Sequence, residues 1–397
     1  MERKKFQNPF EFNLKTKTRF GAGEALNLGE SLKKQKLERI GLIVDSSIYN
    51  LSYTQEIIEK LKSQNFSDIR MWVYDLRAEP DYDSLDRIKA QFIGKNNEPL
   101  VDCFVGIGGG SVLDFAKGLA TVTVNPGPAI TYRGFPENLN MSLPIIALPT
   151  TAGTGSEVTY NAVFINWKEN VKYGINTMNN FPVLAILDPY LVMTCPRGVA
   201  LSSGMDALVH TMESYMTTGA NFMTRIFARE AFHLIFNNLP RIVEEPDNIE
   251  YWSRVQFGAY LAGISLFNAG AGPAGAFSYS LGVRYKVPHG IAGAVFLPHV
   301  VEHNAEKGYD YSDLFDLIEG ADTQLSSKEK NQVFVKKFFG LFERMKISCT
   351  LGQFGVNHEN AGALLRDIDD FQGAFDQNPV PFTIDDGKNL IRKMTES

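Results

Sequence analysis

The sequence predicts two domains of different class, an α/β N-terminal domain over residues 1–196 and an all-helical C-terminal domain over residues 197–397. Two observations lead to this prediction. In the first half, short apolar segments alternate with helical segments, which indicates a doubly wound parallel sheet covered by helices. From about Gly198 onward, long helical patterns dominate. A chain of 397 residues is long enough for two domains, each with its own core.

The predicted strands are short apolar runs, and a helical pattern follows most of them. We expect strands at residues 40–44, 69–74, 102–107, 144–148 and 185–188, and a further pair at 158–167 and 173–175. We expect helices at residues 53–64, 82–94 and 111–122 in the first half. In the second half we expect helices at residues 203–217, 223–239, 251–266, 314–319, 328–346 and 361–368.

The composition excludes several classes of function. A net charge of −6 is the opposite of the basic footprint of a nucleic-acid binder. The longest apolar runs, such as residues 143–148, are far shorter than the roughly 20 residues needed to cross a bilayer. Cys103, Cys195 and Cys349 are too widely spaced to form a disulfide framework. We therefore expect a cytoplasmic protein that acts on a small molecule, with no nucleic-acid or membrane partner.

A glycine-rich loop follows the third predicted strand and leads into a helix. It contains Gly106, Gly108, Gly109 and Gly110, more glycines than a simple turn requires. Glycine lets the backbone approach a ligand closely, and the N–H groups of a helix N-terminus favour an anion. This segment predicts a dinucleotide phosphate site made by Gly108, Gly109, Gly110, Ser111 and Asp114. The alternative is a tight strand-to-helix turn without a ligand.

Two further features fit the same ligand. Residues 149–157 leave the fourth strand, and Thr150, Thr151, Thr154 and Ser156 offer short hydroxyl donors to a ribose or a diphosphate. Asp45 ends the first predicted strand, where a carboxylate accepts ribose hydroxyls of NAD and repels the extra phosphate of NADP. Asp45 is equally well explained as a helix N-cap. Residues 149–157 could be a polar surface loop, but their position after a buried strand, at the same sheet edge as the first glycine loop, favours a shared ligand.

A candidate metal site comes from the second half of the chain. Asp206 and His210 are four residues apart in a predicted helix and so share one face. His289 lies in a later loop between Pro288 and Gly290. One carboxylate and two imidazoles suit Zn²⁺ or Fe²⁺ and leave coordination positions for a substrate oxygen. A chance pair and a structural loop histidine form the alternative reading.

Four segments together resemble the iron-containing (group III) alcohol dehydrogenase family: residues 108–117, 149–157, 204–210 and 288–290. The resemblance covers nearly the whole chain in order and spacing. It implies a dinucleotide-binding α/β domain and a helical domain, with Fe²⁺ or Zn²⁺ in the cleft between them. It also implies reversible, NAD(P)-linked oxidation of an alcohol, and members that are commonly dimers or larger.

The sequence departs from the family at two positions. The family binds its metal with an aspartate and three histidines, of which Asp206, His210 and His289 match three. The remaining histidine is replaced by Gly275, and a second family histidine near the nicotinamide is replaced by Tyr279. We expect a three-ligand site of lower affinity, with room for a larger polyol or sugar. Tyr279 is predicted either to donate a proton or bind a substrate hydroxyl, or only to pack.

Two other functions are compatible with these motifs. A lyase of the dehydroquinate synthase type uses NAD transiently and would require a basic pocket, for which Arg133, Arg284 and Lys286 are candidates. A non-catalytic homologue would explain the missing ligand, although both glycine loops and the metal trio are retained. Within the dehydrogenase interpretation, Arg284 and Lys286, which are close to His289 in the sequence, make a sugar acid such as Kdo a candidate substrate.

Overall fold

The structure is a computed structural model that describes residues 9–75, 80–169 and 171–396. Its contacts divide the chain into two compact units. The α/β unit comprises Leu14–Pro196, and the helical unit comprises residues 9–13 together with residues 197–396. Within the described ranges, no helix is both long enough and apolar enough to cross a membrane.

Residues 9–13 belong to the helical unit, although the sequence analysis placed them in the N-terminal domain. The Asn13 N–H donates to Asn268 Oδ1 at 2.6 Å, and Asn268 Nδ2 donates to the Asn13 carbonyl at 3.0 Å. Phe12 stacks on Phe227 with ring centroids 5.4 Å apart. These contacts join residues more than two hundred positions apart, so sequence patterns gave no indication of them.

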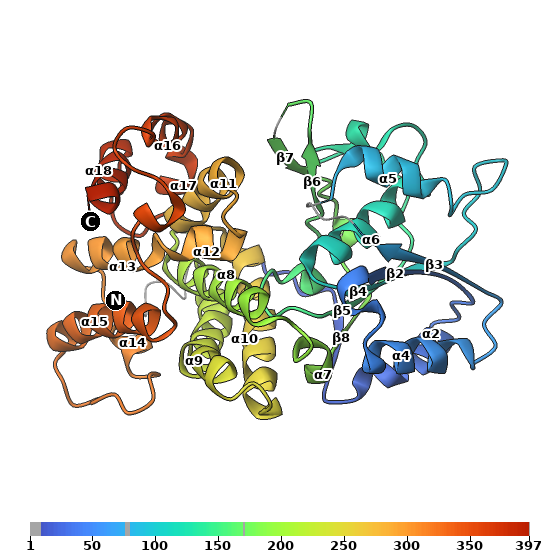
Figure 1. Ribbon diagram of the computed structural model, residues 1–397, viewed down its shortest axis with the longest axis horizontal. Coiled ribbons are helices and arrows are strands. Elements are labelled where there is room, and N and C mark those ends of the chain that lie inside the picture. Colours follow the sequence, from blue (N-terminus) through green and yellow to red (C-terminus); the bar gives the residue numbers. More distant parts are fainter. Residues whose placement is uncertain (1–8, 76–79, 170, 397) are drawn as a thin grey trace. The chain divides into compact units, whose positions relative to one another are not determined.

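A six-stranded parallel sheet forms the centre of the α/β unit, which confirms the predicted fold class (Figure 1). The strand order is β1-β8-β5-β4-β2-β3. The strands are β1 (Lys17–Phe20), β2 (Arg39–Asp45), β3 (Asp68–Tyr74), β4 (Cys103–Gly108), β5 (Ile145–Pro149) and β8 (Leu184–Leu187). The predicted extra pair forms a separate antiparallel hairpin of β6 (Val163–Asn166), which is shorter than expected, and β7 (Val171–Gly174), which begins two residues earlier than expected.

The central strands β4, β5 and β8 are buried along their whole length, and they are apolar throughout rather than alternating, as in a sheet covered on both faces. On β2, Leu42 and Val44 pack into one core with residues of the helices α2 and α4, whereas Ile43 packs into a second core with residues of α5 and α6. Figure 1 shows these two helix pairs on opposite sides of the sheet. The helices of this unit are α2 (Leu28–Lys34), α3 (Ser46–Tyr49), α4 (Ser52–Lys62), α5 (Tyr82–Lys89), α6 (Gly110–Val122) and α7 (Pro189–Val192).

The buried carboxylate of Asp188 hydrogen-bonds to several segments at the edge of the sheet. Asp188 follows β8 and is fully buried. It accepts hydrogen bonds from the N–H groups of Gly23 and Ala25, at 3.2 and 2.9 Å. It also accepts from the Tyr53 hydroxyl at 2.6 Å and from the Tyr190 N–H at 3.0 Å. A charged acceptor with this many donors stabilises the segment after β1, the start of α4 and α7 together.

The helical unit is built around three long helices that pack against one another, α8 (Arg197–Met216), α9 (Phe222–Glu244) and α10 (Ile249–Ala269). Two shorter helices, α11 (Pro273–Tyr285) and α12 (His289–Ala294), pack on each other and on α8. The remaining helices are α13 (Leu297–Glu306), α14 (Ser312–Phe315), α15 (Ser327–Arg344), α16 (Gly362–Asp367), α17 (Gln372–Phe375) and α18 (Ile384–Glu396).

Candidate functional site

The strand order reverses between β2 and β4, at whose carboxyl ends the sequence places the predicted cofactor loops. The chain proceeds from β2 outward to β3, and then returns to place β4 on the other side of β2. Ligands of open α/β sheets bind where the strand order reverses in this way. β2 ends at Asp45 and β4 ends at Gly108, so two of the predicted cofactor positions flank this point.

The two predicted phosphate loops lie against each other. The Thr150 N–H donates to the Gly108 carbonyl at 3.0 Å, and Gly108 is in register with Pro149. A Cβ added at Gly110 would lie 2.7 Å from Thr154 Cγ2, closer than side chains tolerate. Only glycine therefore permits this approach. No described side chain caps the N-terminus of α6, so the first N–H groups of that helix, Ser111 included, remain suited to an anion.

A buried polar network joins α6 to the second loop. Ser156 Oγ donates to Asp114 Oδ1 at 2.6 Å and accepts from Lys117 Nζ at 2.7 Å. Asp114 Oδ2 also accepts from the Val163 N–H at 3.0 Å. Asp114 and Ser156 were predicted to contact the cofactor, but these hydrogen bonds engage both side chains within the protein. Their geometry indicates that they hold the two loops together.

Sequence reasoning missed two members of this network. Lys117 is fully buried, and burial lowers its pKa to about 8 despite the nearby carboxylates of Asp114 and Glu157. Glu157 is buried as well, which raises its pKa to about 7. The signal available in the sequence was a lysine among the apolar residues of a predicted buried helix, because a buried lysine requires a partner.

Asp45 acts as a helix N-cap in this structure. Its Oδ1 accepts from the Ser47 N–H at 2.8 Å and from the Ser47 hydroxyl at 2.7 Å, at the start of α3. The N-cap alternative raised from the sequence is therefore observed. Asp45 is also the last residue of β2, as the proposed contact with ribose requires. That contact remains a prediction.

The three predicted metal ligands come together in the helical unit. His210 Nε2 lies 3.5 Å from Asp206 Oδ1, and His289 Nε2 lies 3.9 Å from the same oxygen. Asp206 is largely buried, with 9 % of its side chain exposed, whereas the His289 side chain is 38 % exposed. Two imidazoles from separate helices thus converge on one carboxylate oxygen.

Gly290 is what brings His289 to Asp206. A Cβ at Gly290 would lie 2.9 Å from Asp206 Cβ and still closer to the Ser202 carbonyl oxygen. Any larger residue would therefore push α12 away from α8. In the dipeptide His289-Gly290, the first residue is a predicted metal ligand. The second has no side chain, and this allows α12 to pack closely against α8.

The donor set fits a divalent ion in its chemistry. An ion with ligands at about 2.1 Å holds neighbouring donors about 3.0–3.4 Å apart. Asp206 and His210 nearly meet this spacing, and His289 needs to approach by about half an ångström. In keeping with this gap, no three His, Cys, Asp or Glu side chains in the described ranges already form a metal-binding group. Ser278 Oγ lies 3.4 Å from His289 Nδ1 and helps to orient this ring.

The residue at position 275 faces a carboxylate instead of supplying a ligand. The Gly275 N–H donates to Glu213 Oε1 at 3.0 Å, and Glu213 is only 2 % exposed. Burial raises the pKa of Glu213, while hydrogen bonds from backbone N–H groups oppose this effect. Glu213 was not singled out from the sequence, although it lies three residues after His210 on the same helix.

Tyr279 lies beside the metal trio with its ring edge against His289. The ring centroids are 5.4 Å apart with an interplanar angle of 69°, and Tyr279 is half exposed. This placement is compatible with both alternatives raised for Tyr279. The basic residues suggested for an anionic substrate are less available: Arg284 pairs with Asp367 at 2.5 Å, and Arg133 pairs with Glu169 at 2.9 Å.

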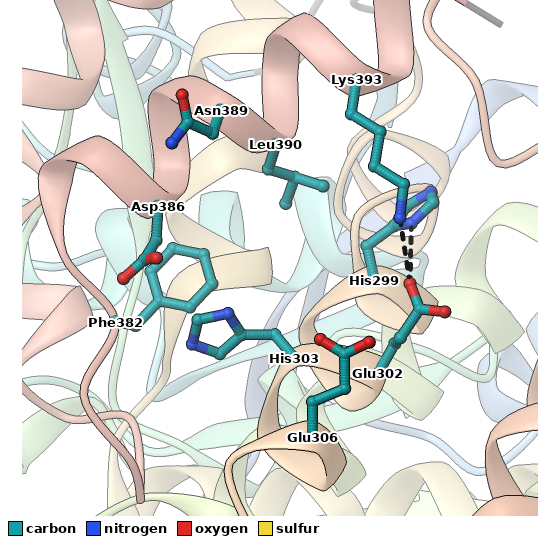
Figure 2. A pocket seen from close by; sticks show the side chains of 9 residues that line it. All are labelled: His299, Glu302, His303, Glu306, Phe382, Asp386, Asn389, Leu390 and Lys393. Atoms are coloured by element: carbon teal, nitrogen blue, oxygen red, sulfur yellow. Dashed lines mark hydrogen bonds and ion pairs between the residues drawn. The ribbon is translucent and has the colours of Figure 1, made fainter.

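A separate hollow of about 320 Å³ lies between α13 and α18, and none of the predicted site residues lines it (Figure 2). Figure 2 shows His299 and Lys393 directed toward Glu302. His299 Nε2 lies 2.9 Å from the Cys349 carbonyl, and His303 Nε2 lies 3.0 Å from the Pro381 carbonyl. Main-chain partners of this kind indicate that both histidines stabilise the packing of the helices.

Comparison with known proteins covers both units. Residues 15–189 match the family model described as iron-containing alcohol dehydrogenase. Residues 200–395 match the model described as Fe-containing alcohol dehydrogenase family, C-terminal.

Two bacterial enzymes are among the proteins that are similar to this chain in sequence. A NAD-dependent methanol dehydrogenase from Bacillus methanolicus is 28% identical over 374 residues, which are 94% of this chain and 96% of that protein. A 1-propanol dehydrogenase from Citrobacter freundii is 30% identical over 74% of this chain and 73% of its own length. Among solved structures, 1,3-propanediol oxidoreductase superimposes with a TM-score of 0.88 at 27% identity, over 98% of this chain and 100% of that one.

Proposed function

The chain belongs to the iron-containing alcohol dehydrogenase family, and we propose that it interconverts an alcohol and its aldehyde or ketone with NAD and a bound divalent metal. The observation that carries the proposal is the convergence of the His210 and His289 imidazoles on the Asp206 carboxylate. That set combines one negative charge with two neutral nitrogen donors, as a catalytic Zn²⁺ or Fe²⁺ site requires.

For the cofactor, we propose NAD rather than NADP. The free N–H groups at the start of α6 would bind the diphosphate, beside Thr150, Thr151 and Thr154 of the second loop. Asp45 would accept the ribose hydroxyls and would repel the phosphate that distinguishes NADP. NAD itself supplies the hydride acceptor at its nicotinamide ring.

For the reaction, we propose that Asp206, His210 and His289 hold the metal and leave positions for the substrate oxygen. A divalent ion bound there supplies Lewis-acid chemistry that lowers the pKa of an alcohol. Asp206 contributes the charge that attracts the ion, and Ser278 orients the His289 ring from its other nitrogen. We assign Tyr279 Oη as a proton relay, because its ring lies against His289 near solvent: the hydroxyl accepts the proton of the substrate hydroxyl while its own proton passes to water.

For the substrate, we propose a small alcohol or a polyol. The glycine at position 275 leaves room that an imidazole would fill. A sugar acid such as Kdo is less well supported, because Arg284 is already paired with Asp367. We also propose a homodimer or larger assembly in the cytoplasm, as predicted from the sequence.

The test is a metal titration of chelated enzyme. Protein stripped of metal is reloaded with Fe²⁺ or Zn²⁺ in steps, and NADH formation from a panel of alcohols is followed by absorbance. NADH formation should rise with bound metal, and His289→Ala should remove most of the response. Turnover that is independent of metal would refute the role of the ion. Absence of net NADH from every alcohol would refute the dehydrogenase and favour a lyase that returns its hydride.

A further inference from the structure

Glu213 lies on the same face of α8 as two of the proposed metal ligands. Asp206, His210 and Glu213 are spaced by four and three positions, which places their side chains in one row along the helix. A histidine that binds a metal usually donates the proton of its second ring nitrogen to a carboxylate or a carbonyl. Glu213 is the carboxylate that this spacing places next to His210.

The start of α11 fixes one oxygen of the Glu213 carboxylate. Oε1 accepts from the Gly275 N–H at 3.0 Å, and the N–H groups of Gly272 and Ala274 also donate to this carboxylate. Gly272 is the N-cap residue of α11 and has no side chain that could cap the helix, so Glu213 takes this role. The carboxylate is therefore held in one orientation, which gives its second oxygen a defined position.

The second oxygen of Glu213 and one nitrogen of His210 are buried without a partner. Glu213 Oε2 and His210 Nδ1 form no hydrogen bond with any residue that the structure describes, and they are the two side-chain atoms of α8 in this state. Buried polar atoms in proteins are nearly always hydrogen-bonded, and bulk solvent does not reach these two. On this helix, each atom is therefore the available partner of the other.

The chemistry of metal binding gives the two atoms complementary roles. His210 Nε2 lies 3.5 Å from Asp206 Oδ1, so Nε2 is the ring nitrogen that faces the proposed ion. A nitrogen that binds a metal carries no proton, and a neutral imidazole then has its single ring proton on Nδ1. This buried N–H requires an acceptor, and an ionised carboxylate oxygen is an acceptor only.

We propose that Glu213 is a positioning residue, whose Oε2 accepts a hydrogen bond from His210 Nδ1–H and so keeps His210 Nε2 free of a proton for the ion. This inference rests on the proposed metal-dependent function and adds a residue that acts through His210. The structure does not yet contain this hydrogen bond, so the His210 ring has to turn to form it. Binding of the ion also requires this ring to move, because 3.5 Å exceeds the spacing of about 3.0–3.4 Å between two ligands of one ion.

The glycine at position 275 makes α11 depend on this contact for its part in the site. With Gly275, α11 supplies no imidazole at this position. Its N–H groups instead hold the Glu213 carboxylate, and the carboxylate holds His210. The helix thus supports the metal site through two successive hydrogen bonds.

The first test is the tautomer of His210 in the wild-type protein, read by NMR with ¹⁵N-labelled histidine side chains. The chain has six histidines, and His210→Asn identifies the signal of this one. In the metal-free and in the Zn²⁺-loaded protein, His210 should carry its proton on Nδ1, and this proton should exchange slowly with water. A proton on Nε2 of His210 in the metal-free protein would overturn the proposal, whether or not any variant folds.

The second test is Glu213→Gln, which preserves the size of the side chain. The N–H groups of α11 require an acceptor, so the amide oxygen should face them and the amide NH₂ should replace Oε2 opposite His210. A donor in this place disfavours Nδ1–H and should move the ring proton to Nε2. The dissociation constant for Zn²⁺, measured by competition with a chromophoric chelator, should rise about 10–100-fold.

Ser214→Ala is the matched control. Ser214 is the next residue of α8 and is fully buried, and its hydroxyl donates to the Thr211 carbonyl of the same helix at 3.2 Å. This variant also removes a buried polar group from α8, so it should lower the Tm. It should leave the dissociation constant for Zn²⁺ and the His210 tautomer unchanged.

The outcomes separate this inference from the function on which it rests. A Glu213→Gln protein that binds Zn²⁺ as tightly as wild type would overturn the positioning role and leave the proposed dehydrogenase intact. An equal loss of affinity in Ser214→Ala would also overturn it, because the loss would then follow from the packing of α8. Wild-type protein that binds neither Zn²⁺ nor Fe²⁺ would instead refute the proposed function.

Discussion

Gly290→Ala is the substitution that most directly tests how the helical unit assembles its site. The added Cβ would lie 2.9 Å from Asp206 Cβ, and closer still to the Ser202 carbonyl oxygen. Carbon atoms in contact are normally about 3.5–4.0 Å apart. The start of α12 must therefore move away from α8 by about 1 Å.

This displacement falls on His289, the residue next to the substitution. The His289 Nε2 to Asp206 Oδ1 distance of 3.9 Å would increase further, whereas a shared ion requires about 3.4 Å or less. Misplacement of a reacting group by about 1 Å can cost on the order of 10²-fold in rate. Overpacking of this kind also destabilises a fold by about 1–3 kcal/mol. We expect a loss of about 10²-fold in kcat/KM with a moderate decrease in Tm.

The assay is kcat/KM for NADH formation at saturating metal, measured together with the metal retained per chain after gel filtration. Gly293→Ala on the same helix serves as the control, since its Cβ would meet neighbours only at ordinary contact distances of 3.4–3.6 Å. It should retain both activity and metal. Should Gly290→Ala bind metal and turn over substrate within about threefold of wild type, the packing argument for His289 would be refuted.

Three more predictions concern other parts of the chain. Gly275→His adds a fourth donor, and we expect about tenfold or more tighter retention of Zn²⁺ on dialysis against a chelator; unchanged retention would contradict the assignment of this position. Ser156→Ala removes the hydroxyl between α6 and the second loop, so the Kd for NADH, read from its fluorescence, should rise about tenfold. The exposed hydroxyl variant Thr131→Ala should leave this Kd unchanged. Because burial raises the pKa of Glu157 from 4.5 to about 7, the folded protein binds this proton more tightly than the unfolded chain does. The stabilising effect is complete below pH 4.5 and is lost as the pH rises through 7, so wild type should lose stability relative to Glu157→Gln over this window. Urea unfolding curves at several pH values measure this, and a constant difference between the two proteins would contradict it.

The fold class was predictable because local patterns determined it. Each apolar run that predicted a strand between residues 40 and 148 forms one, within one or two residues of the expected ends. β1 was missed because Lys17–Phe20 contains only one apolar residue and its side chains are partly or fully exposed. β1 is a strand because it pairs with β8, and its own sequence does not indicate this pairing.

The candidate site was predictable only in part, because local patterns determine some of its residues and tertiary contacts determine the others. The Asp206–His210 pair follows from helix geometry, and the glycine loops follow from their position after strands. The Ser156 bridge to Lys117 and the Glu213 contact with Gly275 depend on tertiary packing between distant segments. Residues of this kind become visible only when the chain is folded, because their partners lie about 40 and 60 positions away in sequence.

The pairing of β1 with β8 also has a consequence for how the protein is made on the ribosome. β1 is translated before every other strand of the sheet, yet its neighbour β8 emerges only after β2, β3, β4 and β5. The buried Asp188 that binds Gly23 and Ala25 emerges just after β8. During synthesis β1 therefore has no pairing partner until β8 has been translated. The sheet is completed when this N-terminal strand pairs with β8.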